Sequence, residues 1–254
     1  MENSSAVPNL IDRPKLIIPL GRGNRGKTFF VRWAVERAQE QGRSTVIADA
    51  DRTNATLSAF FENVVSPPSG DERDVREFLA TFVEKQIEEG FTAIVDFGGG
   101  DTVLKALARE IKLVEFLSAN GITPVAVHLI GPDPDDLSYL RDVEQESILA
   151  PPFTVLVLNE ATVPVHRTAH AAFENAVRSH PILANTVQRG AVVVRMPRLE
   201  PAAEVDRARL TFAAAEEGRV EAGQHIIGPW KRQQIAIWRR AMEESFGPVA
   251  TWLP

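Results

Sequence analysis

The sequence predicts an α/β fold in which a mostly parallel, twisted sheet lies between two layers of helices. Two observations support this three-layer α/β/α class. Short apolar runs alternate with longer helical patterns along the chain, and this alternation is typical of parallel sheets with right-handed crossovers. The apolar runs also contain few polar residues, as expected of parallel strands that are buried on both faces. A ligand is then expected at the C-terminal ends of the strands.

The expected strands are apolar runs that end at turn residues: 15–20, 44–48, 91–97, 123–130, 154–159 and 190–196. The expected helices have apolar residues spaced by three or four: 27–41, 73–89, 103–120, 135–146 and 165–179. Beyond them we expect a loop over 197–201 and helices over 202–217 and 229–246. The stretch 64–73, rich in Pro, Ser and Gly, is predicted to be a loop.

Length and composition favour one compact domain over residues 1–254, with a tail at 1–14 and a basic, aromatic helix and tail at 229–254. The net charge of −6 argues against a surface covered in positive charge for nucleic acid, although a local basic patch stays possible. The absence of cysteine excludes disulfides, thiolate metal sites and cysteine nucleophiles. The first residues do not resemble a signal peptide and no apolar run is long enough for a bilayer, so we expect a cytoplasmic protein.

A phosphate-binding motif stands between the first expected strand and the first expected helix. It consists of Gly21, Arg22, Gly23, Asn24, Arg25, Gly26, Lys27 and Thr28, which is the full P-loop spacing. Glycines let backbone N–H groups turn toward phosphate, and the helix N-terminus adds positive charge. We expect Lys27 to reach the terminal phosphates, Thr28 to bind Mg²⁺, and the following Phe29 to contact the nucleotide. The fold class is therefore predicted to be that of the P-loop NTPases.

Three aspartates stand where the neighbouring strands are expected to end. Asp96 closes an apolar run, so its carboxylate is expected beside the motif, where it can hold Mg²⁺ through water; the alternative is an ordinary turn residue. Asp49 and Asp51 follow the second strand with i, i+2 spacing. One could support the Mg²⁺ shell while the other orients water, or both could belong to a surface turn. The glycines at 98–100 are a plausible switch segment.

From about residue 15 to residue 217 the sequence resembles the ParA/MinD-like ATPases. The stretch 46–57, Val-Ile-Ala-Asp-Ala-Asp-Arg-Thr-Asn-Ala-Thr-Leu, is similar to that family's segment with two aspartates after the second strand. The resemblance implies that Asp51 is the hydrolytic residue and helps to activate water. The expected positions of Thr28, Asp49 and Asp96 make these three the candidate Mg²⁺ ligands. The stretches that end in Asn159 and in Met196-Pro197-Arg198 resemble the family's base-contacting elements. It therefore implies that Asn159, Pro197 and Arg198 bind the base.

Some residues depart from the family pattern. Arg22 replaces the lysine that reaches across a nucleotide-sandwich dimer; an arginine could keep that role, because it keeps the charge and suits phosphate, or it could act only on its own nucleotide. Asn24 replaces a usual glycine, and the usual Pro-Gln after the two aspartates is absent. Three glycines and Asp101 replace paired prolines after Asp96, which is similar to the plasmid stability and conjugation branch, the StbB/TraL-like proteins.

The resemblance implies a slow, Mg²⁺-dependent ATPase that cycles between ATP and ADP and acts as a nucleotide-controlled dimeric switch. Lys27, Arg22 and Mg²⁺ would offset charge on the phosphate while Asp51 positions water. Such a protein would work in positioning, partition or plasmid maintenance and transfer, with an adaptor or cargo protein as its partner. The alternatives are a ligase of the dethiobiotin-synthetase-like type and an adaptor that binds ATP without hydrolysing it.

Two further regions allow more than one interpretation. The helix at 229–246 carries Lys231, Arg232, Arg239 and Arg240 beside apolar residues; we favour packing on the sheet over nonspecific DNA binding, and a membrane contact is the least favoured. Asp133, Asp135 and Asp136 follow the fourth expected strand. They are expected to form a turn and helix cap, although they could line the nucleotide cleft.

Overall fold

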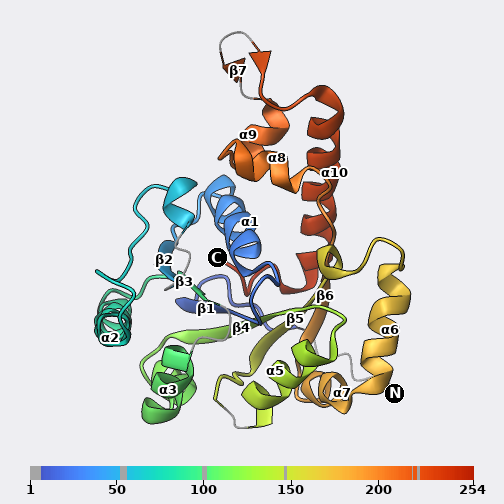
Figure 1. The fold of residues 1–254 in the computed structure, drawn as a ribbon. Helices are drawn as coiled ribbons and strands as arrows, with labels where there is room; N and C mark the ends of the chain where they lie inside the picture. Colours follow the sequence, from blue (N-terminus) through green and yellow to red (C-terminus); the bar gives the residue numbers. More distant parts are fainter. Residues whose placement is uncertain (1–6, 52–55, 99–101, 146–147, 219, 222–223) are drawn as a thin grey trace.

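The computed structural model describes residues 7–51, 56–98, 102–145, 148–218, 220–221 and 224–254. Its centre is a six-stranded, parallel sheet in the order β2-β3-β1-β4-β5-β6, covered by helices on both faces (Figure 1). The strands are β1 (Lys15–Leu20), β2 (Val46–Ala50), β3 (Ala93–Phe97), β4 (Thr123–Ile130), β5 (Phe153–Asn159) and β6 (Val192–Met196). The predicted α/β/α fold class is confirmed.

Alternate residues of the central strand β1 point into two different hydrophobic cores. Ile17 lies in a core with residues of α1 (Lys27–Glu40), α8 (Ala202–Arg207), α9 (Phe212–Glu217) and α10 (Pro229–Phe246). Leu16 and Ile18 lie in a core with residues of α2 (Glu72–Glu89), α3 (Thr102–Ile111) and α4 (Leu113–Ala119). A parallel strand buried on both faces is apolar at nearly every position, which explains the apolar run from Leu16 to Leu20 in the sequence.

The remaining elements complete the two layers. A smaller core joins α5 (Pro134–Gln145), α6 (Ala169–Ser179) and α7 (Pro181–Gln188) to β4 and β5, and α6 lies next to α7. The short elements are η1 (Leu57–Ala59), η2 (Glu160–Thr162), η3 (Gly247–Val249) and the hairpin of β7 (Val220–Glu221) and β8 (Gln224–His225). Among the described residues, no helix combines the length and the hydropathy that crossing a bilayer requires.

Two of the predicted helices are in fact broken. The prediction at 103–120 was wrong at Lys112, which has φ 50° and separates α3 from α4. The prediction at 202–217 was wrong at Arg209, which also has φ 50° and lies between α8 and α9. Neither break is marked by glycine or proline, the usual local signals. The positive φ of these residues is therefore set by the packing of the helices on either side.

Other boundaries moved by a few residues. Strand β2 begins at Val46 and ends at Ala50, not at 44–48 as predicted, so Asp49 lies inside the strand. Helix α6 begins only at Ala169, because the Thr168 side chain accepts a hydrogen bond from the Ala171 N–H and caps it. The sequence prediction missed α7 and the β7–β8 hairpin.

Helix α10 has the bounds that the sequence predicts and packs on the sheet through buried Ile235, Trp238, Met242 and Phe246. The Trp238 indole N–H donates to the Pro197 carbonyl at 2.9 Å. Several basic side chains of α10 bond within the chain: Lys231 to Glu204, Arg232 to the Glu217 carbonyl, and Arg239 to Glu40 and Glu216. Much of the positive charge that suggested DNA binding is therefore engaged internally, and DNA binding stays a prediction.

Candidate functional site

The P-loop joins β1 to α1, as its sequence predicts, and its backbone has several left-handed residues. Gly21 has φ 145°, Asn24 has φ 59°, and Gly26, the N-cap of α1, has φ 86°. Asn24 has a conformation that asparagine tolerates better than most residues. A Cβ on Gly26 would lie only 2.7 Å from Nδ2 of Asn159. Glycine at position 26 is thus required by both its conformation and its neighbour.

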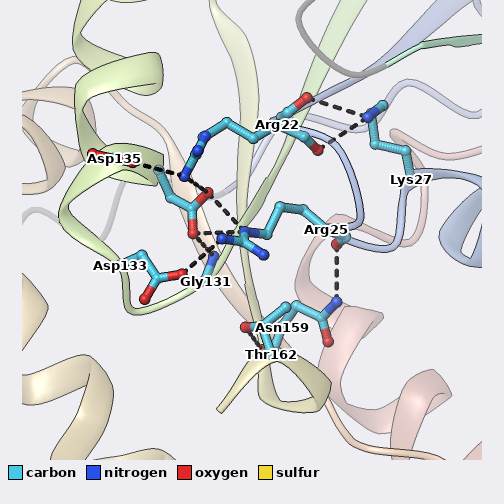
Figure 2. A network of polar contacts seen from close by, with 10 residues as sticks. Arg22, Arg25, Lys27, Gly131, Asp133, Asp135, Asn159 and Thr162 are labelled. Carbon is cyan, nitrogen blue, oxygen red and sulfur yellow. Dashed lines mark hydrogen bonds and ion pairs between the residues drawn. The ribbon is translucent and has the colours of Figure 1, made fainter. Parts of the chain in front are cut away.

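The Lys27 side chain folds back across the loop. Its ammonium donates to the carbonyls of Gly21 and Arg22, both at 3.2 Å, and the residue is buried (Figure 2). Such carbonyl contacts solvate an ammonium only in part, and an anionic phosphate is a stronger acceptor. The role of Lys27 in binding phosphate stays a prediction.

Thr28 and Asp96 form the connection between α1 and β3 at this site. The Thr28 hydroxyl donates to Oδ2 of Asp96 at 2.6 Å. Oδ1 of Asp96 is buried and has no hydrogen-bond partner among the described residues. Burial raises the pKa of Asp96 to about 7, and the hydrogen bond from Thr28 opposes that increase. A cation at Oδ1 would favour the ionised carboxylate.

These oxygens fit a magnesium ion. Mg²⁺ prefers oxygen ligands and is usually held by one or two protein oxygens together with water and phosphate. A hydroxyl and a buried, unpartnered carboxylate oxygen beside a phosphate-binding loop supply that donor set. In the described part of the chain, no group of three or more His, Cys, Asp or Glu side chains is placed to hold a metal ion. A Mg²⁺ ion here would therefore also need ligands from phosphate and water.

Asp49 and Asp51 lie next to Asp96 but have different surroundings. Asp49 is paired in register with Asp96 on the adjacent strand, and it is buried. Its Oδ1 accepts the Asp51 N–H at 3.3 Å and its Oδ2 accepts the Leu57 N–H at 3.0 Å. Asp49 therefore holds the chain that follows β2, and its predicted place in the Mg²⁺ shell stays a prediction.

The Asp51 carboxylate lies against the backbone after β3. A Cβ on Gly98 would be 2.9 Å from Oδ1 of Asp51, so a glycine lets the two segments approach closely. Asp51 also lines the same cleft as Lys27 and Thr28. Its role in positioning water stays a prediction. Of the predicted switch segment only Gly98 is described, because residues 99–101 lie outside the described residues, as do 52–55.

A cleft of about 580 Å³ extends from the P-loop toward η1 and α8. Its lining includes Gly23, Asn24, Gly26, Lys27, Thr28, Phe29, Asp51 and, on the far side, Arg32, Phe60, Asp206 and Arg209. Buried Arg32 lies over the Phe60 ring at 3.6 Å and forms an ion pair with Asp206. The far side was missed by sequence reasoning, because no local pattern shows that α1, η1 and α8 meet.

The two arginines of the P-loop extend away from this cleft to the acidic residues at the start of α5. Arg22 pairs with Asp135 at 3.3 Å, while Arg25 pairs with Asp133 at 2.7 Å and with Asp136 at 2.8 Å (Figure 2). Asp136 also accepts the Gly131 N–H at 3.2 Å. Asp133 thus lies directly before α5 and Asp135 and Asp136 lie in its first turn, and the helix cap expected here stays a prediction. These acidic residues also tether the P-loop, which the sequence did not indicate.

Two of the residues that the resemblance implies for binding the nucleotide base, Asn159 and Arg198, form hydrogen bonds to backbone groups of the protein in this structure. Asn159 donates from Nδ2 to the Arg25 carbonyl at 2.9 Å (Figure 2). Its Oδ1 accepts the Ala161 N–H. Arg198 donates to the carbonyls of Glu160 and Val163 in the loop after β5. None of Asn159, Pro197 and Arg198 is among the residues that line the cleft. Their contact with a base stays a prediction.

No family model matches the sequence, and no curated protein matches it either. Among solved structures, chloroplast FtsY from Physcomitrella patens is 15% identical, with 77% of this chain and 62% of that chain covered and a TM-score of 0.48. The cell division protein FtsY from Thermotoga maritima is 18% identical, with 76% and 64% covered and a TM-score of 0.48. The chain thus spans less than two thirds of either protein, and likenesses at this level assign no function.

The fold class rests on the chain's own features. A complete phosphate-binding motif lies between the first strand and first helix of a parallel sheet, and a strand-end aspartate on the adjacent β3 bonds the motif's threonine. By fold and motif, the chain is a P-loop protein of the α/β/α class.

Proposed function

We propose that this protein is a Mg²⁺-dependent ATP hydrolase that acts as a nucleotide-controlled dimer in positioning, partition or plasmid maintenance and transfer. The observation that carries the hydrolase assignment is the bond of 2.6 Å between Thr28 and Asp96, beside buried Lys27. Burying a carboxylate oxygen without a hydrogen-bond partner costs free energy of folding. A metal ion bound next to the phosphate loop would supply the missing partner. ATP, the dimer and the cellular process are supported by the sequence resemblance.

In this mechanism the residues of the chain have separate tasks. The P-loop amides and Lys27 bind the phosphates, and Lys27 stabilises the charge that develops on the transferred phosphoryl group. Thr28 and Asp96 would hold Mg²⁺, which would supply positive charge to offset that of the phosphates. Asp51 orients the attacking water. Asp49 keeps Asp51 in place, since its carboxylate accepts the Asp51 N–H.

The dimer part of the proposal depends on Arg22. In the structure Arg22 pairs with Asp135 of its own chain, and its side chain is 40% exposed. An exposed arginine is accessible to a second molecule, and its planar fork suits a phosphate. Under this proposal Arg22 contacts the phosphates of the partner's nucleotide when ATP is bound. A cargo or adaptor protein would then recognise the ATP-bound dimer.

Light scattering after size exclusion tests the proposal on the wild type, Asp51→Ala and Asp71→Ala, each with ADP and with ATP and Mg²⁺. Asp71 is exposed and lies outside the site, so Asp71→Ala is the matched control. The expected result is a dimer only with ATP, which accumulates in Asp51→Ala because hydrolysis is lost. Dimers without phosphate release by the wild type would instead support the non-hydrolysing adaptor.

Monomers under every condition would contradict the switch. If the wild type then phosphorylated a small carboxylate substrate, the ligase alternative would be favoured. Arg22→Ala separates the two possible roles of that arginine: loss of the dimer with ATP binding kept supports a contact across the interface. An unchanged dimer would assign Arg22 to its own subunit.

A further inference from the structure

The two arginines of the P-loop are held by acidic partners that differ in burial. The Asp136 side chain is only 2% exposed, and both of its oxygens accept from Nε of Arg25 at 2.8 Å. Asp136 also accepts the Gly131 N–H. Removing Arg25 from this position would leave a buried carboxylate without its cation, which is strongly unfavourable. Arg25 is therefore a fixed anchor between the P-loop and the start of α5.

Arg22 is held much more weakly by its acidic partners than Arg25 is. Its partner Asp135 is 73% exposed and lies 3.3 Å from Nη1, and Asp136 is 3.9 Å away. A solvent-exposed ion pair changes an equilibrium constant by about fivefold at most. Asp135 also lies in the first turn of α5, where the helix N-terminus stabilises a carboxylate that has lost its cation. Asp136 keeps its closer partner Arg25 at 2.8 Å when Arg22 moves, so Arg22 can leave both aspartates at small cost.

The Arg22 backbone lies at the Lys27 end of the P-loop. The Arg22 carbonyl accepts from the Lys27 ammonium at 3.2 Å (Figure 2), so the arginine begins near the group that is expected to bind the terminal phosphates. A nucleoside triphosphate brings more negative charge to this end than a diphosphate does. That charge competes with Asp135 for the Arg22 guanidinium.

We propose that Asp135 holds Arg22 away from the phosphates in the nucleotide-free protein and releases it to a nucleoside triphosphate. Asp135 thereby sets how strongly the site prefers a triphosphate to a diphosphate. This inference rests on the proposed function, because it requires a nucleotide at the P-loop. It does not require that Arg22 cross to a second subunit. Asp133, which pairs with Arg25 and not with Arg22, has no such role.

Titration calorimetry with Mg²⁺ and either ATPγS or ADP tests the inference on five proteins: wild type, Asp135→Asn, Asp133→Asn, Arg22→Ala and the double variant Arg22→Ala/Asp135→Asn. Asp133 is also exposed, so Asp133→Asn controls for the loss of one negative charge at the same turn. Asp135→Asn should bind ATPγS about two- to fivefold more tightly, with ADP affinity unchanged. Asp133→Asn removes one partner of Arg25 and none of Arg22, so any change in affinity should be the same for both nucleotides. In the Arg22→Ala background, Asp135→Asn should have no effect.

Several results would overturn the inference. Unchanged or weaker ATPγS binding by Asp135→Asn would mean that the pair does not compete with phosphate. A gain that persists without Arg22, or an equal gain in Asp133→Asn, would mean simple repulsion between carboxylates and phosphate. In those cases wild-type binding is intact and the proposed function stands. A wild type that binds neither nucleotide would contradict the proposed function, and the inference with it.

Discussion

The Thr28 hydroxyl and the Asp96 carboxylate lie 2.6 Å apart and join the first turn of α1 to the end of β3. Only one oxygen of Asp96 takes part, since Oδ1 is buried without a hydrogen-bond partner among the described residues. The pair therefore combines a structural bond with an acceptor that is still available to a cation. This relationship connects the fold to the proposed chemistry, and each part of it can be tested.

Removing the Thr28 hydroxyl should weaken the magnesium site. In Thr28→Ala we expect the affinity for Mg²⁺ with ATP to fall roughly 10- to 100-fold, as for other supporting residues of metal sites. ATP binding with a chelator present should change little, since the hydroxyl is assigned to the metal and not to phosphate. Calorimetry with and without Mg²⁺ measures both quantities. Ser118→Ala, an exposed hydroxyl on α4, is the control; an equal loss in chelator would contradict the assignment.

Removing the Lys27 ammonium should weaken the binding of phosphates directly. Lys27→Met keeps most of the side-chain volume and should lower ATP affinity by about 10- to 100-fold, because charge-assisted hydrogen bonds to phosphate are lost. Lys85→Met removes an exposed ammonium on α2 and should bind ATP normally. Fluorescence competition with a labelled nucleotide gives both affinities. Normal ATP binding by a folded Lys27→Met protein would be incompatible with the assigned role.

Asn159 should act on the P-loop and not on the base. Asn159→Ala leaves the Arg25 carbonyl without its donor, so we expect the free energy of unfolding to fall by about 1–2 kcal/mol. Affinities for ATP and GTP should fall by the same factor. Chemical denaturation and parallel titrations check this, with Asn120→Ala as the exposed control. A changed ratio of the two affinities would instead support the base contact that the sequence resemblance implies.

Glu36 should make the stability of the fold depend on pH. Burial raises its pKa to about 7 from an ordinary value of 4.5, although Oε2 accepts the N–H groups of Phe212 and Ala213. The folded protein therefore binds this proton more tightly than the unfolded chain does. The contribution of Glu36 is complete below about pH 4.5 and is lost as the pH rises to about 7.

Glu36→Gln removes this titration. Its free energy of unfolding, relative to the wild type, should increase between pH 5 and pH 8 by up to about 3 kcal/mol. Urea denaturation at several pH values measures the difference, and Glu88→Gln, an exposed change on α2, should show no such trend. A difference between Glu36→Gln and wild type that stays constant with pH would show that Glu36 does not titrate in this range.

Local sequence patterns predicted the central strands and most helices because periodicity reports burial directly. After Lys15, the run from Leu16 to Leu20 is apolar, since β1 has strands on both sides and helices on both faces. The same patterns missed the breaks at Lys112 and Arg209, where φ is positive without glycine. At such positions packing between helices outweighs the intrinsic preference of the backbone, so the local sequence does not predict the break.

A phosphate loop of defined spacing after an apolar strand can be recognised from the sequence, because glycine, lysine and threonine in that order meet local backbone and charge requirements. The surroundings of that loop come from the tertiary structure. Arg25 and Asp136 are 111 residues apart, and Arg32 and Asp206 are 174 apart, so no local period could place them together. Which acid holds Arg22, and what forms the far side of the cleft, depend on contacts between distant segments that only the packed sheet and helices create.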